Sequence, residues 1–133
     1  QFLNEAGDRP YPIIWKRNKT MGEFYTKKDD RYTVSFDKKN TGVDAWTMAF
    51  ALVNYVNGRP QVHFNDTKSG DSLKVFSTVV FATQQFIRNH NPKTIVFTGA
   101  FSRISLYKQV GKFIKGYKLT VEPLGIFTLT REK

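Results

Sequence analysis

The sequence predicts one α+β domain, in which an antiparallel meander of three strands is followed by helix, strand, helix and strand. Apolar residues alternate with polar ones in the first half, and recur at three- and four-residue spacings in two later segments. Turn-forming residues separate these segments. With 133 residues the chain can bury one core without disulfides. We therefore expect two helices packed on a mixed sheet and one functional site.

An irregular N-terminal arm is expected over residues 1–22, followed by a single domain over residues 23–133. Two prolines in Arg9-Pro10-Tyr11-Pro12 hold their neighbours extended, and a short strand is expected at residues 13–16. The residues expected to anchor the arm on the domain are Tyr11, Ile14 and Trp15. The alternative is that residues 1–19 dock onto a partner protein.

Period-two alternation predicts the meander. The apolar residues that alternate are Tyr32, Val34 and Phe36 within residues 23–37, and then Trp46, Met48, Phe50 and Leu52. The residues between the second set are small, so we expect both faces of that strand to be covered. Asn57-Gly58 is a strong signal for a two-residue hairpin turn, and it joins this strand to a third one at residues 59–64.

A helix and a central strand come next. The apolar residues at helical spacing are Leu73, Phe76, Val79, Val80, Phe86 and Ile87. Asp71 or Ser72 is suited to cap the first turn, and Asn91-Pro92 ends the helix. Residues 94–98 are apolar on both faces, which is typical of a central strand reached by a helical crossover.

A second helix is expected from about residue 102 to Gly116. Its apolar stripe consists of Leu106, Tyr107, Val110, Phe113 and Ile114. Lys108, Lys112 and Lys115 form the opposite face. The last strands are expected at residues 119–121 and 126–130, around a turn that contains Pro123 and Gly125.

The net charge of +10 is unevenly distributed, because the segment from Arg88 to Lys118 holds seven basic residues and no acidic one. Such a segment attracts polyanions, either nucleic acid or an acidic protein. The residues expected to contact nucleic acid are Arg88, Lys93, Lys108, Lys112, Lys115 and Lys118. The binding would be nonspecific and salt-sensitive, since no sequence-reading motif is present. The alternative is an ordinary solvated surface.

Several function classes are disfavoured by composition. No cysteine is present, which argues against a disulfide framework or a thiolate metal site and favours an intracellular setting. No apolar run approaches the length of a membrane span. His63 and His90 are far apart without an acidic cluster beside them, so we expect no metal.

Two segments resemble the GNAT superfamily of acyl-CoA-dependent N-acyltransferases. In that family a loop of the form Gln or Arg, two residues, Gly, one residue, Gly or Ala holds the cofactor pyrophosphate through backbone amides. The residues at the matching positions are Thr67, Lys68, Ser69, Gly70, Asp71 and Ser72. The loop keeps Gly70 and a small residue at Ser72, whereas Thr67 replaces the leading residue. The resemblance implies an acetyl-CoA or other acyl-CoA site here.

The second resembling segment is Arg103-Ile104-Ser105-Leu106-Tyr107-Lys108-Gln109-Val110-Gly111, which is similar to the last family helix. The resemblance implies that Tyr107 protonates the departing thiolate and that Arg103 lies near the cofactor. Tyr107 as a packed core aromatic is the alternative. Amine attack also needs a base, and His63 is the candidate among His63, Asp66 and Glu122. The resemblance thus implies a GNAT-like fold over residues 23–130.

Two other functions remain open. The chain can be a GNAT-like protein with a degenerate cofactor loop, which serves as a basic module for nucleic acid or a partner protein. The strings Lys74-Val75-Phe76-Ser77-Thr78 and Ser102-Arg103-Ile104-Ser105-Leu106-Tyr107 also look like those of small uncharacterised bacteriophage proteins. That resemblance implies a viral structural or accessory protein, located in the host cytoplasm or in the virion.

Overall fold

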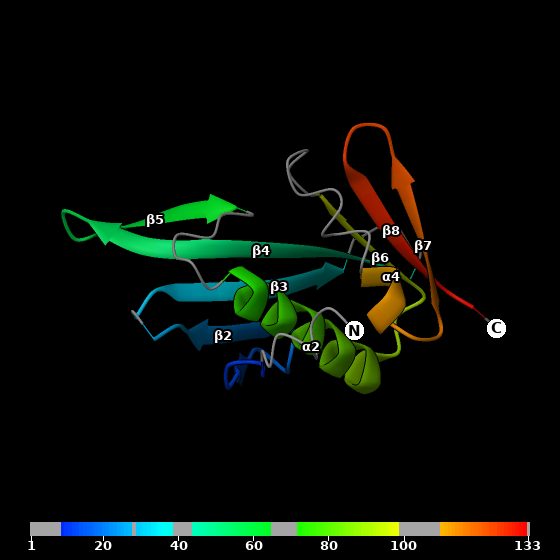
Figure 1. Cartoon of the computed structure of the whole chain (residues 1–133), viewed down its shortest axis with the longest axis horizontal. Helices are drawn as coiled ribbons and strands as arrows, with labels where there is room; N and C mark the ends of the chain where they lie inside the picture. Colours follow the sequence, from blue (N-terminus) through cyan, green and yellow to red (C-terminus); the bar gives the residue numbers. More distant parts are fainter. Residues whose placement is uncertain (1–8, 28, 39–43, 65–71, 99–109, 133) are drawn as a thin grey trace.

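A computed structural model describes residues 9–27, 29–38, 44–64, 72–98 and 110–132. The elements are β1 (Ile14–Lys16), β2 (Met21–Tyr25), β3 (Arg31–Lys38), β4 (Ala45–Val56), β5 (Arg59–Phe64), α2 (Ser72–His90), β6 (Thr94–Thr98), α4 (Val110–Phe113), β7 (Tyr117–Glu122) and β8 (Ile126–Arg131). This order confirms the α+β class. Figure 1 shows α2 lying across the sheet.

The sheet has eight strands and is antiparallel at every described pairing except one. Its strand order is β1-β2-β3-β4-β6-β8-β7, and β5 pairs with β4 beside this path. β4 and β6 are parallel, which requires the crossover through α2. The predicted central strand is therefore confirmed, since β6 lies between β4 and β8.

The meander has more strands than the three expected, because β1 to β5 are consecutive antiparallel strands. The alternation within residues 23–37 predicts one strand, but the chain reverses between β2 and β3. In this turn the Thr26 amide donates to the Asp30 carbonyl at 3.0 Å, and Asp29 has a φ of 65°. Asp29 tolerates this left-handed conformation better than most residues.

The arm is joined to the sheet, and the expected boundary between residues 22 and 23 falls inside β2. Tyr11 is buried, and its amide donates to Thr78 Oγ1 of α2 at 2.9 Å. Trp15 Nε1 donates to Gln85 Oε1 of the same helix at 3.0 Å. The anchoring prediction is confirmed for these two residues. It is wrong for Ile14, whose side chain lies on the opposite face and is 51% exposed.

Aromatic side chains form much of the core between the sheet and α2. Tyr11, Phe24, Tyr32 and Phe50 stack in series, with ring centroids 6.0, 5.3 and 5.5 Å apart. They come from the arm and from β2, β3 and β4 in turn, so the series links neighbouring strands. Apolar burial of this kind is the main stabilising term of the fold.

Only part of the second expected helix falls within the described chain. α4 spans four residues, and its Phe113 carbonyl accepts a 2.7 Å hydrogen bond from Gln84 Nε2 of α2. Ile114 is buried in the same core. Both described helices therefore pack on one face of the sheet. On the other face of β4 Ala51 is buried, while Thr47 and Ala49 are half-buried.

Candidate functional sites

The outer edge of β4 divides between two partners. Ala45 to Thr47 pair with β6, whereas Ala51 to Val56 pair with β5. Among the described strands, residues 48–50 have a ladder partner only in β3. We call this stretch, with the last residues of β5 and β6, the fork. The two wings of the sheet that diverge from it are seen in Figure 1.

Both strands that border the fork end there. β6 continues for Phe97 and Thr98 beyond its last pairing with β4, and β5 ends at Phe64, opposite Ala51. A position where the strand connections diverge is a common location for ligands in open sheets. Thr47 lies at the base of the fork, and its Oγ1 is buried with no hydrogen-bond partner. A buried hydroxyl without a partner carries an energetic cost, so Thr47 Oγ1 is an unsatisfied polar atom beside the fork.

The residues expected to bind the cofactor or to catalyse are only partly within the described chain. Ser72 is the first residue of α2, and His63 is in β5 opposite the backbone of Leu52. The remaining ones, which lie outside the described residues, are Thr67, Lys68, Ser69, Gly70, Asp71, Arg103 and Tyr107. Their roles stay predictions. The loop from 65 to 71 joins β5 to α2, and it therefore starts at the fork.

A second candidate site is formed where several chain segments meet at the far end of β6. The Arg131 amide donates to the Lys93 carbonyl at 2.8 Å, and Arg131 Nη1 donates to the Asn91 carbonyl at 2.7 Å. The buried Tyr117 hydroxyl donates to the Pro92 carbonyl. These bonds hold the end of α2, the start of β7 and the end of β8 together.

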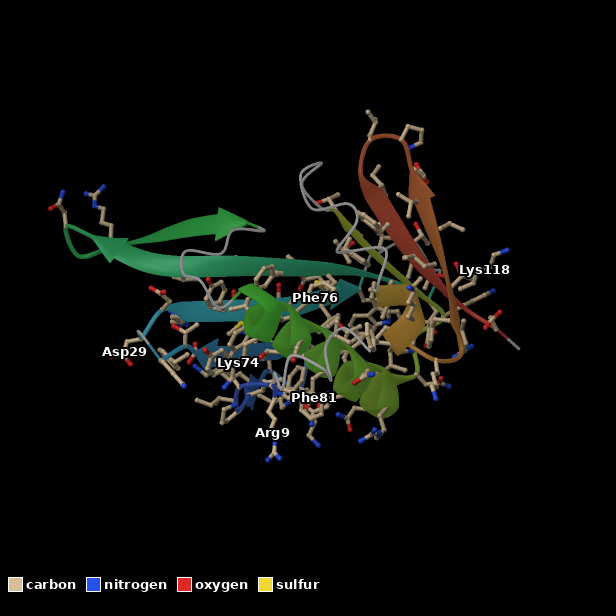
Figure 2. All side chains as sticks on the ribbon, in the orientation of Figure 1. Arg9, Asp29, Lys74, Phe76, Phe81 and Lys118 are labelled. Atoms are coloured by element: carbon tan, nitrogen blue, oxygen red, sulfur yellow. The ribbon has the colours of Figure 1, made fainter. Side chains whose placement is uncertain are left out.

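Exposed cations gather on these segments. Arg17 and Lys19 flank Asn18, whose carbonyl is 3.1 Å from His90 Nε2 at the end of α2. We define the basic end as the eight exposed residues Arg17, Lys19, Arg88, Lys93, Lys112, Lys115, Lys118 and Arg131. Figure 2 shows Lys118 on the opposite side of the molecule from Asp29.

Five of the six lysines and arginines expected to bind nucleic acid fall at the basic end, and Lys108 lies outside the described residues. Sequence reasoning missed Arg17, Lys19 and Arg131. They are far from the basic segment in the sequence, and only the pairing of β8 and the contact with Asn18 bring them to it. Burial raises the pKa of Tyr117, the nearby Arg131 opposes this rise, and Asp44 adds to it.

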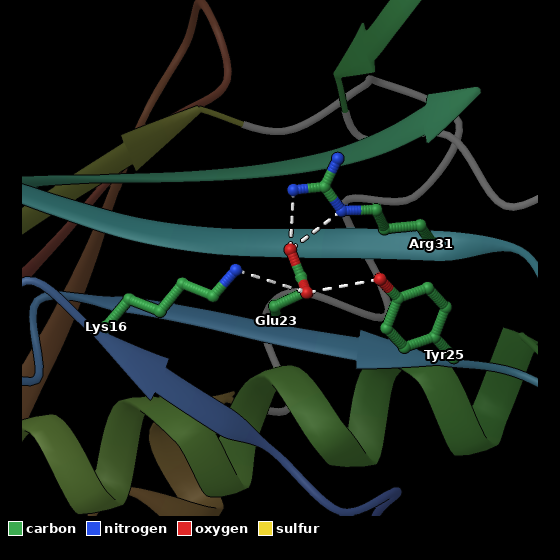
Figure 3. A network of polar contacts seen from close by, with 4 residues as sticks. All are labelled: Lys16, Glu23, Tyr25 and Arg31. Atoms are coloured by element: carbon green, nitrogen blue, oxygen red, sulfur yellow. Dashed lines mark hydrogen bonds and ion pairs between the residues drawn. The ribbon is translucent and has the colours of Figure 1, made fainter. Parts of the chain in front are cut away.

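A third cluster surrounds a buried carboxylate on the face of the sheet opposite α2 (Figure 3). Glu23 is 4% exposed. Arg31 approaches its Oε2 through Nε at 2.7 Å and through Nη2 at 2.5 Å. Lys16 Nζ lies 3.5 Å and Tyr25 Oη 3.2 Å from its Oε1. We call these four residues the carboxylate cluster.

The cluster keeps Glu23 ionised. Burial by itself raises the pKa of Glu23, but the hydrogen bonds and charge of Arg31, with help from Tyr25 and Lys16, bring the pKa below its usual value. Such a carboxylate is a poor proton acceptor near neutral pH. A surface pocket of about 500 Å³ adjoins it, lined by Lys16, Glu23, Tyr25, Asp29, Asp30, Arg31 and Val53. We assign the cluster a structural role.

Comparison of the chain with protein-family models, curated proteins and solved structures gives no match. No group of three or more His, Asp or Glu suited to a metal ion occurs in the described part of the chain. Within that part, no helix combines the length and the apolar character that crossing a membrane requires. The fork and the basic end are therefore the two candidate sites for a ligand.

Proposed function

We propose that the chain is a GNAT-like protein that binds an acyl-CoA at the fork and uses it for N-acyl transfer. The observation that carries this proposal is the parallel pair of β4 and β6, which separates after Thr47↔Val96. The resemblance of Thr67 to Ser72 to a pyrophosphate-binding loop supports the same position, because this loop follows β5 and opens into α2.

The geometry of the fork is compatible with an acyl-CoA. The pantetheine arm is extended and contains two amides, which can pair with a strand edge as an added strand does. Residues 48–50 offer such an edge between β5 and β6. Thr47 Oγ1, at its base, is buried without a hydrogen-bond partner and would reach a ligand only if the ligand displaced the atoms that cover it. The first turn of α2 begins at Ser72, and the backbone amides of a first turn have no carbonyl partner within the helix, which suits a pyrophosphate.

The cofactor, when bound, would supply an acyl group activated as a thioester. In the proposed reaction this chain would orient the acyl group and provide a proton donor and a proton acceptor. The Tyr107 hydroxyl would donate a hydrogen bond or a proton to the sulfur of the leaving group, and His63 would accept a proton from the attacking amine. The role of Tyr107 comes from the resemblance, and that of His63 comes from the need of amine attack for a base. The fork supports the proposed position of the cofactor.

Isothermal titration of the full chain with acetyl-CoA tests the binding step. We expect saturable binding, and about tenfold weaker binding by Gly70→Glu, because a carboxylate would repel the pyrophosphate. The absence of heat at millimolar acetyl-CoA would contradict the proposal. An acetylation assay with a pool of primary amines then separates transfer from binding alone.

Thr47→Val supplies a second, nearly isosteric test at the base of the fork. Valine removes the buried hydroxyl that lacks a partner, so we expect the stability of the free protein to stay equal or to rise. We also expect weaker acetyl-CoA binding, by about fivefold, because the ligand loses one hydrogen bond. Unchanged binding would show that this hydroxyl does not face the cofactor.

A further inference from the structure

We propose that the basic end binds double-stranded nucleic acid through its backbone phosphates, at a surface separate from the fork. The eight cations belong to distant parts of the chain, namely the β1–β2 turn, the end of α2, the connection from α2 to β6, the segment around α4, and strands β7 and β8. Three contacts join these segments: the Arg131 amide and guanidinium donate to the carbonyls of Lys93 and Asn91, the Glu132 amide donates to the Gly116 carbonyl, and His90 Nε2 lies against the Asn18 carbonyl.

The cations of the basic end are not compensated within the described structure. None of the eight forms an ion pair with a described carboxylate, whereas Arg31 and Lys16 do so elsewhere. The side chain of Asp44 accepts a 3.0 Å hydrogen bond from Trp46 Nε1. Glu132 follows Arg131, and its amide donates to the Gly116 carbonyl at 2.8 Å, so this exposed carboxylate offsets part of the positive charge. The remaining positive field is therefore available to an external polyanion.

The packing of the described aromatic rings at the basic end favours a duplex over a single strand as the ligand. Single-strand sites stack bases on exposed aromatic rings. Here Tyr117 is buried, and Trp46 packs edge-on against Phe86 with centroids 5.0 Å apart. His90 lies 4.7 Å from Phe86 in a stacked arrangement. These described rings thus pack within the protein, and the lysine and arginine side chains of the basic end are left to contact phosphates.

The basic end and the fork lie at opposite ends of β6. Thr94 begins the strand beside the Lys93 carbonyl, and Thr98 ends it at the fork. A substitution at the basic end therefore leaves residues 48–50 in place. This separation makes the present proposal independent of acyl-CoA binding.

The test compares two variants with the same change in net charge. One is Lys93→Glu with Lys115→Glu and Lys118→Glu at the basic end. The matched control is Arg9→Glu with Lys27→Glu and Arg59→Glu, three exposed residues elsewhere in the chain. Figure 2 shows Arg9 well away from Lys118. Fluorescence anisotropy with a labelled DNA duplex of about 20 base pairs measures binding, and thermal unfolding confirms that both variants are folded.

We expect the wild-type dissociation constant to rise steeply between about 50 and about 200 mM salt. The basic-end variant should bind at least about tenfold more weakly with a shallower salt dependence, and the control should bind within about threefold of wild type. Equal losses in the two variants would overturn the proposal, because net charge alone would then explain binding. Tighter binding of polyglutamate than of duplex would also overturn it, in favour of an acidic protein partner.

Discussion

The charges of the carboxylate cluster are paired around a buried group, whereas those of the basic end are exposed and form no ion pair with a described carboxylate. In the cluster, two cations and a phenol converge on one carboxylate that is 4% exposed. At the basic end, eight exposed cations share no ion pair with a described carboxylate. A buried charge needs partners from its own chain, whereas an exposed charge is stabilised by water. The cluster therefore supports the fold, and the basic end is free to attract an anion.

The largest effect is expected when the cluster loses its main partner. Arg31→Met leaves Glu23 buried without the two closest donors, and we expect the free energy of unfolding to fall by about 3 kcal/mol. Urea unfolding measures this change. Lys27→Met removes the same charge from an exposed turn and serves as the control, with an expected change below about 0.5 kcal/mol. A small effect of Arg31→Met would show that water already compensates Glu23.

Acid should weaken the cluster more gradually. The pKa of Glu23 is lower in the folded chain than in the unfolded one, so its contribution to stability is complete above the unfolded pKa of about 4.3. That contribution is lost as the pH falls through the folded pKa. We expect Glu23→Gln to remove this part of the acid sensitivity in urea titrations at a series of pH values. Identical pH profiles for wild type and variant would contradict the ionised state assigned to Glu23.

A smaller effect is expected from the hydrogen bond that supports the basic end. Tyr117→Phe leaves the Pro92 carbonyl without its phenolic donor, and we expect a loss of about 1.5 kcal/mol in urea unfolding. The same variant keeps every cation, so duplex binding should weaken only by about twofold. If Tyr117→Phe weakened duplex binding as much as the triple charge reversal does, the position of the turn at Pro92 and Lys93, rather than its charge, would govern the interaction.

The smallest effect on stability is expected from removing the cations themselves. Like charges on the basic end repel each other at low salt. We therefore expect Lys93→Glu with Lys115→Glu and Lys118→Glu to change the free energy of unfolding by less than about 0.5 kcal/mol, with any gain disappearing at high salt. A large loss of stability would indicate that these lysines are paired, which would remove the contrast with the carboxylate cluster.

Local sequence patterns were sufficient for much of the fold. Alternation placed β3 and β4, Asn57-Gly58 placed the hairpin to β5, and helical spacing with Asn91-Pro92 bounded α2. The strand β2 was missed because the polar turn at residues 26–30 interrupts an otherwise continuous alternation. Patterns within one element are encoded locally, whereas a chain reversal depends on a few turn residues.

The sites were less predictable because they depend on register between strands. Glu23 and Arg31 come together only through the pairing of β2 with β3, and nothing in their eight-residue separation indicates it. The fork likewise arises from the change of β4 partner after Thr47. Arg131 reaches the basic end only because β8 pairs with β6, which places the Arg131 amide against the Lys93 carbonyl. Composition predicted a positive surface, and tertiary structure determined where it lies.

The central claim is that the fork and the basic end are two separate sites for anionic ligands. A competition experiment tests it most directly: acetyl-CoA is titrated into the preformed complex of the protein with labelled duplex, at constant ionic strength. We expect the anisotropy of the duplex to stay constant while acetyl-CoA binds with the affinity it has for the free protein. Displacement of the duplex as acetyl-CoA saturates the protein would contradict it, since both ligands would then share one surface.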